Sequence, residues 1–188
     1  MKPLFAPIYL ASREYWNTRF NDIHIPLSYD FVRQLLLAYP DANEDVVVPA
    51  ILLHDNGWKM IPEDLQNQSF GPNMKREDLR RLHETEGVRI ADEILTKLGF
   101  ISTLNGEILE IIDGHDSRPG ALSLNDKLVK DADKLWRFTP TGQDIDHRRF
   151  ERELMAHALW TREQIDEWFF TDRAKQIAQD VLKQTIAE

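Results

Sequence analysis

Apolar residues recur every three or four positions along most of the chain, which is the spacing of helices that bury one face. Phe31 and Leu35 show this spacing in one segment, and Val47, Val48 and Ile51 show it in the next. No stretch shows the sustained alternation of strands that are joined by hairpin turns. The pattern therefore predicts an all-α fold.

The same spacing predicts helices near residues 8–19, 27–38, 44–55, 76–98, 104–114, 123–137, 147–157 and 162–185. Turn-forming residues support these limits, because Gly57 follows the third predicted helix and Gly99 closes the fourth. Thr161, with Gln164 three residues later, resembles a capping box at the start of the last helix.

The length of 188 residues predicts a single domain over 1–188 with its own hydrophobic core. The polar segment 61–75 is the longest predicted loop, and it either is an ordinary solvated connection or closes over a site as a lid. The C-terminal helices, 147–185, are predicted either to cover the core or to form a homodimer surface.

Composition excludes several classes of protein. The chain has no cysteine, so a metal ion would be held by imidazole, carboxylate or water. The formal net charge of −9 argues against a protein that binds a nucleic-acid duplex through a basic surface. No apolar run approaches the roughly twenty residues that a membrane span needs. A cytoplasmic protein without a membrane partner is therefore expected.

The dipeptide His54-Asp55 ends an apolar helix and is followed by Asn56 and Gly57. An imidazole and a carboxylate at the end of a buried helix are costly unless both have a partner. A divalent cation is the natural partner, and the two oxygens of Asp55 can bridge to a second ion.

A second pair of carboxylates, Asp131 and Asp133, lies inside the mainly apolar helix predicted over 123–137. Residues two apart face nearly opposite sides of a helix, so only one of the two can enter a given site. The other is expected to face solvent.

With these elements the chain resembles the HD superfamily of metal-dependent phosphohydrolases, whose ordered pattern is His, His-Asp and Asp on the helices of an all-α bundle. His24, His54-Asp55 and Asp133 follow this order, and the resemblance covers about residues 20–140. In the family, the last aspartate follows an alanine and precedes a leucine by two positions. Ala132 and Leu135 therefore favour Asp133 over Asp131.

Two further histidines match elements of the two-metal members. Gly87 follows His83 by four residues, and His115 precedes a Ser-Arg-Pro-Gly turn that is similar to the Gly-Arg-Pro-Gly turn of the dinucleoside tetraphosphate hydrolase branch. The resemblance implies that His24, His54, Asp55 and Asp133 bind one ion and that His83, His115 and Asp55 bind a second. Mixed nitrogen and oxygen ligands favour iron or manganese, with zinc, cobalt, nickel and magnesium as further candidates.

The implied activity is hydrolysis of a phosphoester or phosphoanhydride in a small phosphorylated substrate, with a nucleotide expected first. A hydroxide that bridges the two ions would attack phosphorus. Lys59 and Arg118 are candidate phosphate-binding residues, or else ordinary surface charges. Asp116 either orients a ligand imidazole, protonates the leaving group or is a turn residue.

The remaining aromatic and histidine residues are expected to be structural. This group comprises Trp58, Trp136, Phe138, His147 and His157, although the first three could also stack on a nucleobase. The ligand set leaves two other functions open. The same six ligands support a mixed-valent diiron oxygenase in other family members, and a regulatory module could also use this scaffold. The intact ligand set argues against the regulatory module, because such a module has no physical need for buried charges.

Overall fold

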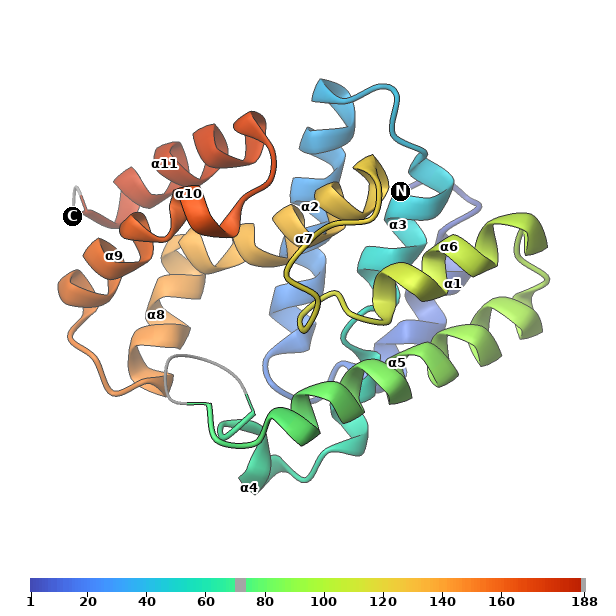
Figure 1. Cartoon of the computed structure of the whole chain (residues 1–188), viewed down its shortest axis with the longest axis horizontal. Coiled ribbons are helices and arrows are strands. Elements are labelled where there is room, and N and C mark those ends of the chain that lie inside the picture. Colours follow the sequence, from blue (N-terminus) through green and yellow to red (C-terminus); the bar gives the residue numbers. More distant parts are fainter. Residues whose placement is uncertain (70–73, 187–188) are drawn as a thin grey trace.

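The computed structural model describes residues 1–69 and 74–186, and these residues form helices and turns without any β-strand (Figure 1). The predicted all-α fold is therefore confirmed. The α-helices are α1 (Ala6–Ser12), α2 (Asn21–Ala38), α3 (Glu44–Leu53), α4 (Glu63–Gln66), α5 (Glu77–Leu98), α6 (Ser102–Ile112), α7 (Leu124–Leu135), α8 (Pro140–Arg149), α9 (Leu154–Glu163), α10 (Ile165–Trp168) and α11 (Asp172–Ile186). Short 3-10 helices are η1 (Arg13–Tyr15), η2 (Asn56–Met60) and η3 (Trp136–Phe138). Within the described residues, no helix has the length and apolarity needed to cross a bilayer.

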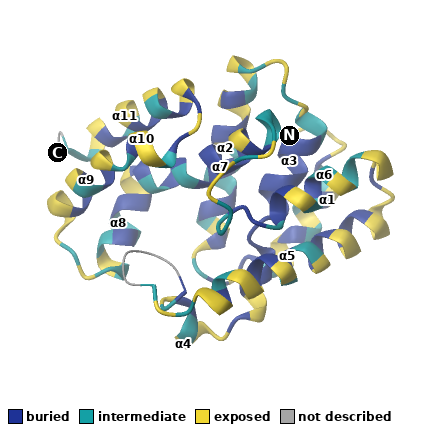
Figure 2. Cartoon of the chain, in the orientation of Figure 1, coloured by how far each residue is buried: buried dark blue, intermediate teal, exposed yellow. Residues whose placement is uncertain are grey.

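Helix α3 is the centre of the core. Every residue from Val46 to Leu53 is buried, and α3 packs against α1, α2, α6 and α7. Figure 2 shows that the buried positions gather on α3 and on the inner faces of its neighbours. A helix that is apolar all round needs neighbours on every side. The dipeptide His54-Asp55, which follows α3, therefore lies deep inside the molecule.

One hydrophobic cluster extends from Phe5, before α1, to Leu182 in α11. Helix α7 contacts α2 and α3, and it also contacts α11. In Figure 1, α8–α11 lie together on one side of the molecule, α1, α3, α5 and α6 lie on the other, and α7 crosses α2 between them. The last turn of α7 therefore faces both groups of helices.

The N-terminal helices differ from the prediction. The helix predicted over 8–19 is replaced by α1 and η1, and α2 begins at Asn21 rather than near residue 27. Phe20 precedes α2 in a left-handed conformation, with φ 61°. Pro26 lies inside α2 and removes one backbone donor, which explains why the residue pattern indicated a later start.

The C-terminal helices also differ from the prediction. A single helix over 147–157 is wrong, because this range spans the end of α8 and the start of α9. The helix predicted over 162–185 is interrupted between α10 and α11. Thr161 lies in the last turns of α9, where its hydroxyl donates to the carbonyl oxygen of His157 at 2.8 Å. Thr161 is therefore not the capping residue of a helix that starts there.

The segment 61–75, predicted as the longest loop, contains the short helix α4. The buried amide of Gln66 donates to the carbonyl oxygens of Trp58 and Ile61 at 3.3 and 2.9 Å. The part of the segment that contains α4 is therefore held in place by these hydrogen bonds. Residues 70–73 lie outside the described residues, and the predicted lid falls partly on them.

Candidate metal centre

Three of the predicted ligands meet at one point although they come from three parts of the chain. His24 lies on α2, His54 directly follows α3, and Asp133 lies in the last turn of α7. The Nε2 atoms of His24 and His54 are 3.1 Å apart, and Oδ1 of Asp133 lies 3.2 Å from each of them. These three side chains have a geometry that can surround one metal ion.

Asp55 lies between this group and a second one. Its Oδ2 is 3.4 Å from Nε2 of His24, and its Oδ1 is 3.3 Å from Nε2 of His115 and 3.8 Å from Nε2 of His83. The indole of Trp58 donates to Oδ1 at 3.0 Å, which fixes the carboxylate. One carboxylate oxygen therefore faces each group, as a bridging ligand requires.

The second group consists of His83, His115 and Asp116. The Nε2 atoms of the two histidines are 3.3 Å apart, and Oδ2 of Asp116 lies 3.7 Å from Nε2 of His83. The ring of His83 also stacks on Trp58, with the ring centroids 4.0 Å apart. Asp116 was expected to orient a ligand, to act as an acid or to be a turn residue, whereas its carboxylate lies where a further metal ligand would be.

In His54 and His115, Nδ1 is hydrogen-bonded to the backbone, which leaves Nε2 free to bind a cation. Nδ1 of His54 lies 2.8 Å from the carbonyl oxygen of Ile51, and Nδ1 of His115 lies 2.9 Å from that of Ile112. A carbonyl only accepts, so Nδ1 carries the proton and Nε2 of a neutral ring presents its lone pair. Lone pairs and carboxylate oxygens that converge in this way fit a divalent cation among them.

The charges of the cluster shift the pKa values of its members. Burial raises the pKa of Asp55 and Asp133, but the facing imidazoles outweigh burial and hold both values well below the ordinary range. Burial lowers the pKa of His115, yet Asp55 and Asp116 raise it to about 9. Burial and the charge of His115 lower the pKa of His83 to about 3. Ionised carboxylates and a neutral His83 are the forms that bind a metal ion.

Asp131 and Asp133 point to different places, as the helical spacing predicts. Asp131 accepts hydrogen bonds from the backbone N–H groups of Phe170 and Thr171 at 2.8 and 3.0 Å. The hydroxyl of Thr171 donates to it at 2.6 Å. Asp131 is therefore buried against the start of α11, and the expectation that it faces solvent is wrong.

Two buried charged residues, which were not selected from the sequence, hold the turn that carries His115. Glu84 accepts hydrogen bonds from two backbone N–H groups of this turn at 2.9 and 2.7 Å. Lys130, on α7, donates to three of the turn's carbonyl oxygens at 2.8, 2.8 and 3.0 Å. Their only sequence signals are that Glu84 adjoins His83 and that Lys130 falls on the apolar face of α7.

Arg118 and Lys59, the two residues expected to bind phosphate, are placed elsewhere. The guanidinium of Arg118 donates to the carbonyl oxygens of Asp113 and Glu110 and pairs with the buried Asp126 at 3.2 Å. Arg118 therefore closes the turn after α6. Lys59 is exposed on η2 and lines neither of the two cavities that reach the cluster. The exposure of Lys59 agrees with the alternative expectation of an ordinary surface charge, whereas Arg118 has structural partners that neither expectation included.

Two arginines that the sequence did not single out lie beside the cluster instead. Arg19 and Arg137 line a small cavity together with His24, Asp55 and Asp133. The guanidinium of Arg19 lies 3.7 Å from a ring centroid of Trp58, and the backbone of Arg19 is left-handed, with φ 50°. Residue spacing does not reveal such a backbone, because most side chains avoid it.

The aromatic residues next to the aspartates are buried. Trp58, Trp136 and Phe138 have at most 2% of their surface exposed, as core residues do. The ring of Trp136 lies 5.0 Å from that of His24. Trp58 and Trp136 therefore support the ligands from the side of the core.

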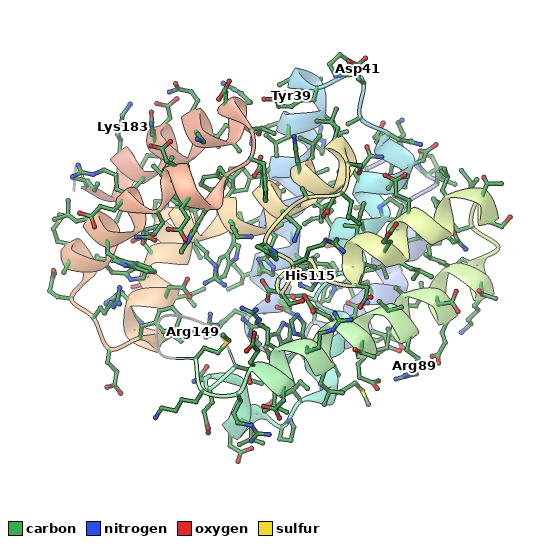
Figure 3. All side chains as sticks on the ribbon, viewed as in Figure 1. Tyr39, Asp41, Arg89, His115, Arg149 and Lys183 are labelled. Carbon is green, nitrogen blue, oxygen red and sulfur yellow. The ribbon has the colours of Figure 1, made fainter. Side chains whose placement is uncertain are left out.

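A cavity of about 330 Å³ extends from the cluster to the C-terminal helices. Asp116 and Asp133 line it, and α9 contributes His157 and Trp160. The C-terminal helices, which were expected to cover the core or to form an interface, thus form a wall of this cavity. His157, which was expected to be only structural, is part of this wall. Figure 3 shows His115 near the centre of the molecule, whereas Arg89 and Lys183 lie at its periphery.

The fold and this cluster define an all-α protein with a histidine and aspartate set that is suited to metal ions. Residues 21–137, more than half of the chain, match the HD domain family, and the chain belongs to this family. All six predicted ligands lie within the matched residues. No match was found among curated proteins or among solved structures. HD domains bind divalent metals and are generally metal-dependent hydrolases.

Proposed function

We propose that the protein uses two divalent ions to hydrolyse a phosphoester or phosphoanhydride bond in a small phosphorylated metabolite, with nucleotides as the first candidates. The observation that carries this proposal is the position of Asp55 between two groups of imidazole nitrogens. Each group also contains a second carboxylate, from Asp133 or from Asp116. Iron or manganese suits this mixed ligand set best.

Ions bound there would supply positive charge to the phosphoryl oxygens and lower the pKa of a water molecule. Arg19 and Arg137 line the same small cavity and would offset the negative charge that develops on the phosphoryl group. Hydrolysis joins the OH of water to phosphorus, breaks the bond from phosphorus to the leaving oxygen, and gives the remaining proton to that oxygen.

The turn that carries His115 bears on the choice of substrate. Ser117 occupies the position of the first glycine in the turn of the dinucleoside tetraphosphate hydrolases, and its hydroxyl donates to Glu84 at 2.6 Å. The turn is thus held by a side chain that glycine lacks. We therefore propose a nucleotide or a similar small phosphate ester rather than membership of that branch.

A diiron oxygenase is the second candidate, because the same six ligands serve both reactions. The test loads purified protein with manganese or iron and measures release of phosphate or nucleotide from a panel of nucleotides, dinucleotides and phosphorylated metabolites, with and without oxygen. We expect release that is lost in Asp133→Ala and kept in the exposed control Lys59→Ala. Oxygen consumption without any hydrolysis would contradict the proposal in favour of the oxygenase. Bound metal without either activity would favour a regulatory module.

A further inference from the structure

The 330 Å³ cavity has a wall of aromatic rings on the side opposite the metal ligands. Phe150, His157, Trp160 and Trp168 line it, and neighbouring rings in this order have centroids 6.2, 5.7 and 5.6 Å apart. Trp160 and Trp168 are only partly buried, and the guanidinium of Arg152 lies 4.4 Å from a ring centroid of Trp160. Such a wall suits a planar ring, since aromatic rings stack on one another.

His157 is the member of this wall that is hardest to explain as structure alone. Only 2% of its surface is exposed, and its Nδ1 has no hydrogen-bond partner among the described residues. A buried polar atom without a partner destabilises a fold. Burial also lowers the pKa of His157, so a neutral ring offers one donor and one acceptor. A ligand with a polar edge would satisfy it.

Basic residues line the same cavity as the metal ligands and the aromatic wall. Lys134 and Arg137 line the cavity beside Asp133, and Arg137 is held by Asp146 at 2.6 Å. A molecule that places its phosphate at the metal ligands would therefore extend past two basic residues toward the rings of α9. One cavity is thus lined by two carboxylates of the metal cluster, by basic residues and by the aromatic wall.

Building on the proposed phosphohydrolase function, we infer that this cavity binds the leaving group of the substrate. The leaving group carries one planar ring with a hydrogen-bonding edge, and His157 recognises that edge. The volume of about 330 Å³ is at the lower end of the range for small-molecule sites. It has room for one ring system. A phosphate ester with a single ring fits it better than a molecule with two nucleosides.

The test compares His157→Phe and Trp160→Ala with Leu159→Ala, which changes an exposed position on the same helix. Substrates are nucleoside monophosphates, glycerol phosphate and a dinucleoside tetraphosphate, assayed with manganese-loaded protein. For nucleoside monophosphates, we expect KM to rise roughly tenfold in His157→Phe, the effect of leaving a polar group unpaired, with a smaller change in kcat. Leu159→Ala should behave as the wild type.

Two readouts do not depend on turnover. Nucleoside monophosphates should quench the tryptophan fluorescence of the wild type, glycerol phosphate should not, and Trp160→Ala should lose much of the quenching. His157→Phe should unfold at no lower denaturant concentration than the wild type, because it removes an unpaired buried atom.

The outcomes separate this inference from the proposed function. Hydrolysis of glycerol phosphate and nucleoside monophosphates with equal kcat/KM, unchanged in His157→Phe, would overturn the ring site and leave the phosphohydrolase intact. Ring-dependent quenching without any phosphate release would keep the ring site but contradict the phosphohydrolase. A His157→Phe variant that loses stability and keeps its KM would show that His157 is only structural.

Discussion

Two aspartates on α7, Asp131 and Asp133, lie two residues apart and have different partners. Asp133→Ala should lose the ion held by His24 and His54, because Oδ1 of Asp133 lies 3.2 Å from Nε2 of both histidines. Asp131→Ala should keep the metal and lower the free energy of unfolding by roughly 1–3 kcal/mol, because it leaves buried N–H groups before α11 unpaired. Metal analysis and urea unfolding in chelator measure the two effects.

Each variant is the control for the other, since each removes one aspartate carboxylate from the same helix. Loss of metal from Asp131→Ala with retention in Asp133→Ala would contradict the assignment of the ligand. Equal loss from both would indicate that α7 itself is disrupted.

At the residue scale, the sequence predicted the side chains that converge on the cluster better than those that support them. The order of the histidines and aspartates is visible in the chain, and the structure brings all six together. Glu84 and Lys130 form hydrogen bonds with backbone groups of the turn that carries His115, and this turn is distant from Glu84 in sequence. Contacts of this kind leave no local pattern. For the same reason, the proximity of Arg118 to His115 in sequence did not reveal its actual partners.

At the scale of elements, the crossing of η2 and α5 depends on two glycines. A methyl group on Gly57 would lie 1.8 Å from the carbonyl oxygen of His83 and 2.5 Å from the backbone nitrogen of Gly87. Gly57→Ala should therefore push α5 and His83 away from Asp55. We expect it to destabilise the fold by roughly 3 kcal/mol and to weaken binding of the second ion, as measured by urea unfolding and metal titration.

Gly106→Ala is the matched control for this substitution. It lies inside α6, and nothing lies within 4 Å of the added methyl group. It should stabilise the protein by up to about 1 kcal/mol, through helix propensity alone. If Gly57→Ala kept wild-type stability and both ions, the close crossing of η2 and α5 would be unimportant.

The helices that the sequence predicted well have apolar stripes and clear ends. Helix α5 ends at Gly99, which adopts a left-handed conformation, and α7 begins after Ser123, whose hydroxyl accepts from the N–H of Asp126. Helix α8 was missed because its sequence, PTGQDIDHRR, has almost no apolar residue. It is held by polar contacts instead, since Asp146 pairs with both Arg137 and Arg149. The spacing of apolar residues along the chain does not reveal polar contacts of this kind.

At the scale of the whole molecule, the cluster ties together distant parts of the fold. Its ligands come from α2, the end of α3, α5, the turn after α6, and α7. The sequence predicted these ligands in their order along the chain. It did not predict the cavity, because the aromatic wall of α8–α10 meets the ligands only after the C-terminal helices pack on α7.

Removal of metal should therefore lower the melting temperature of the whole fold. Ions that bind only the folded arrangement add about 2.7 kcal/mol at a concentration one hundred times Kd, which corresponds to a few degrees for a chain of this size. Scanning fluorimetry with manganese and with chelator measures this shift, and Asp133→Ala, which removes a ligand of one of the two ions, should show a smaller shift.

The shift should also depend on pH. The pKa of His115 is raised to about 9, so protonation of His115 stabilises the metal-free fold below that pH, and this contribution is lost as the pH rises through 9. A metal ion has to displace that proton. The melting temperature difference between manganese and chelator should therefore grow from pH 6 to pH 9. A difference that stays constant over this range would show that His115 is not a ligand.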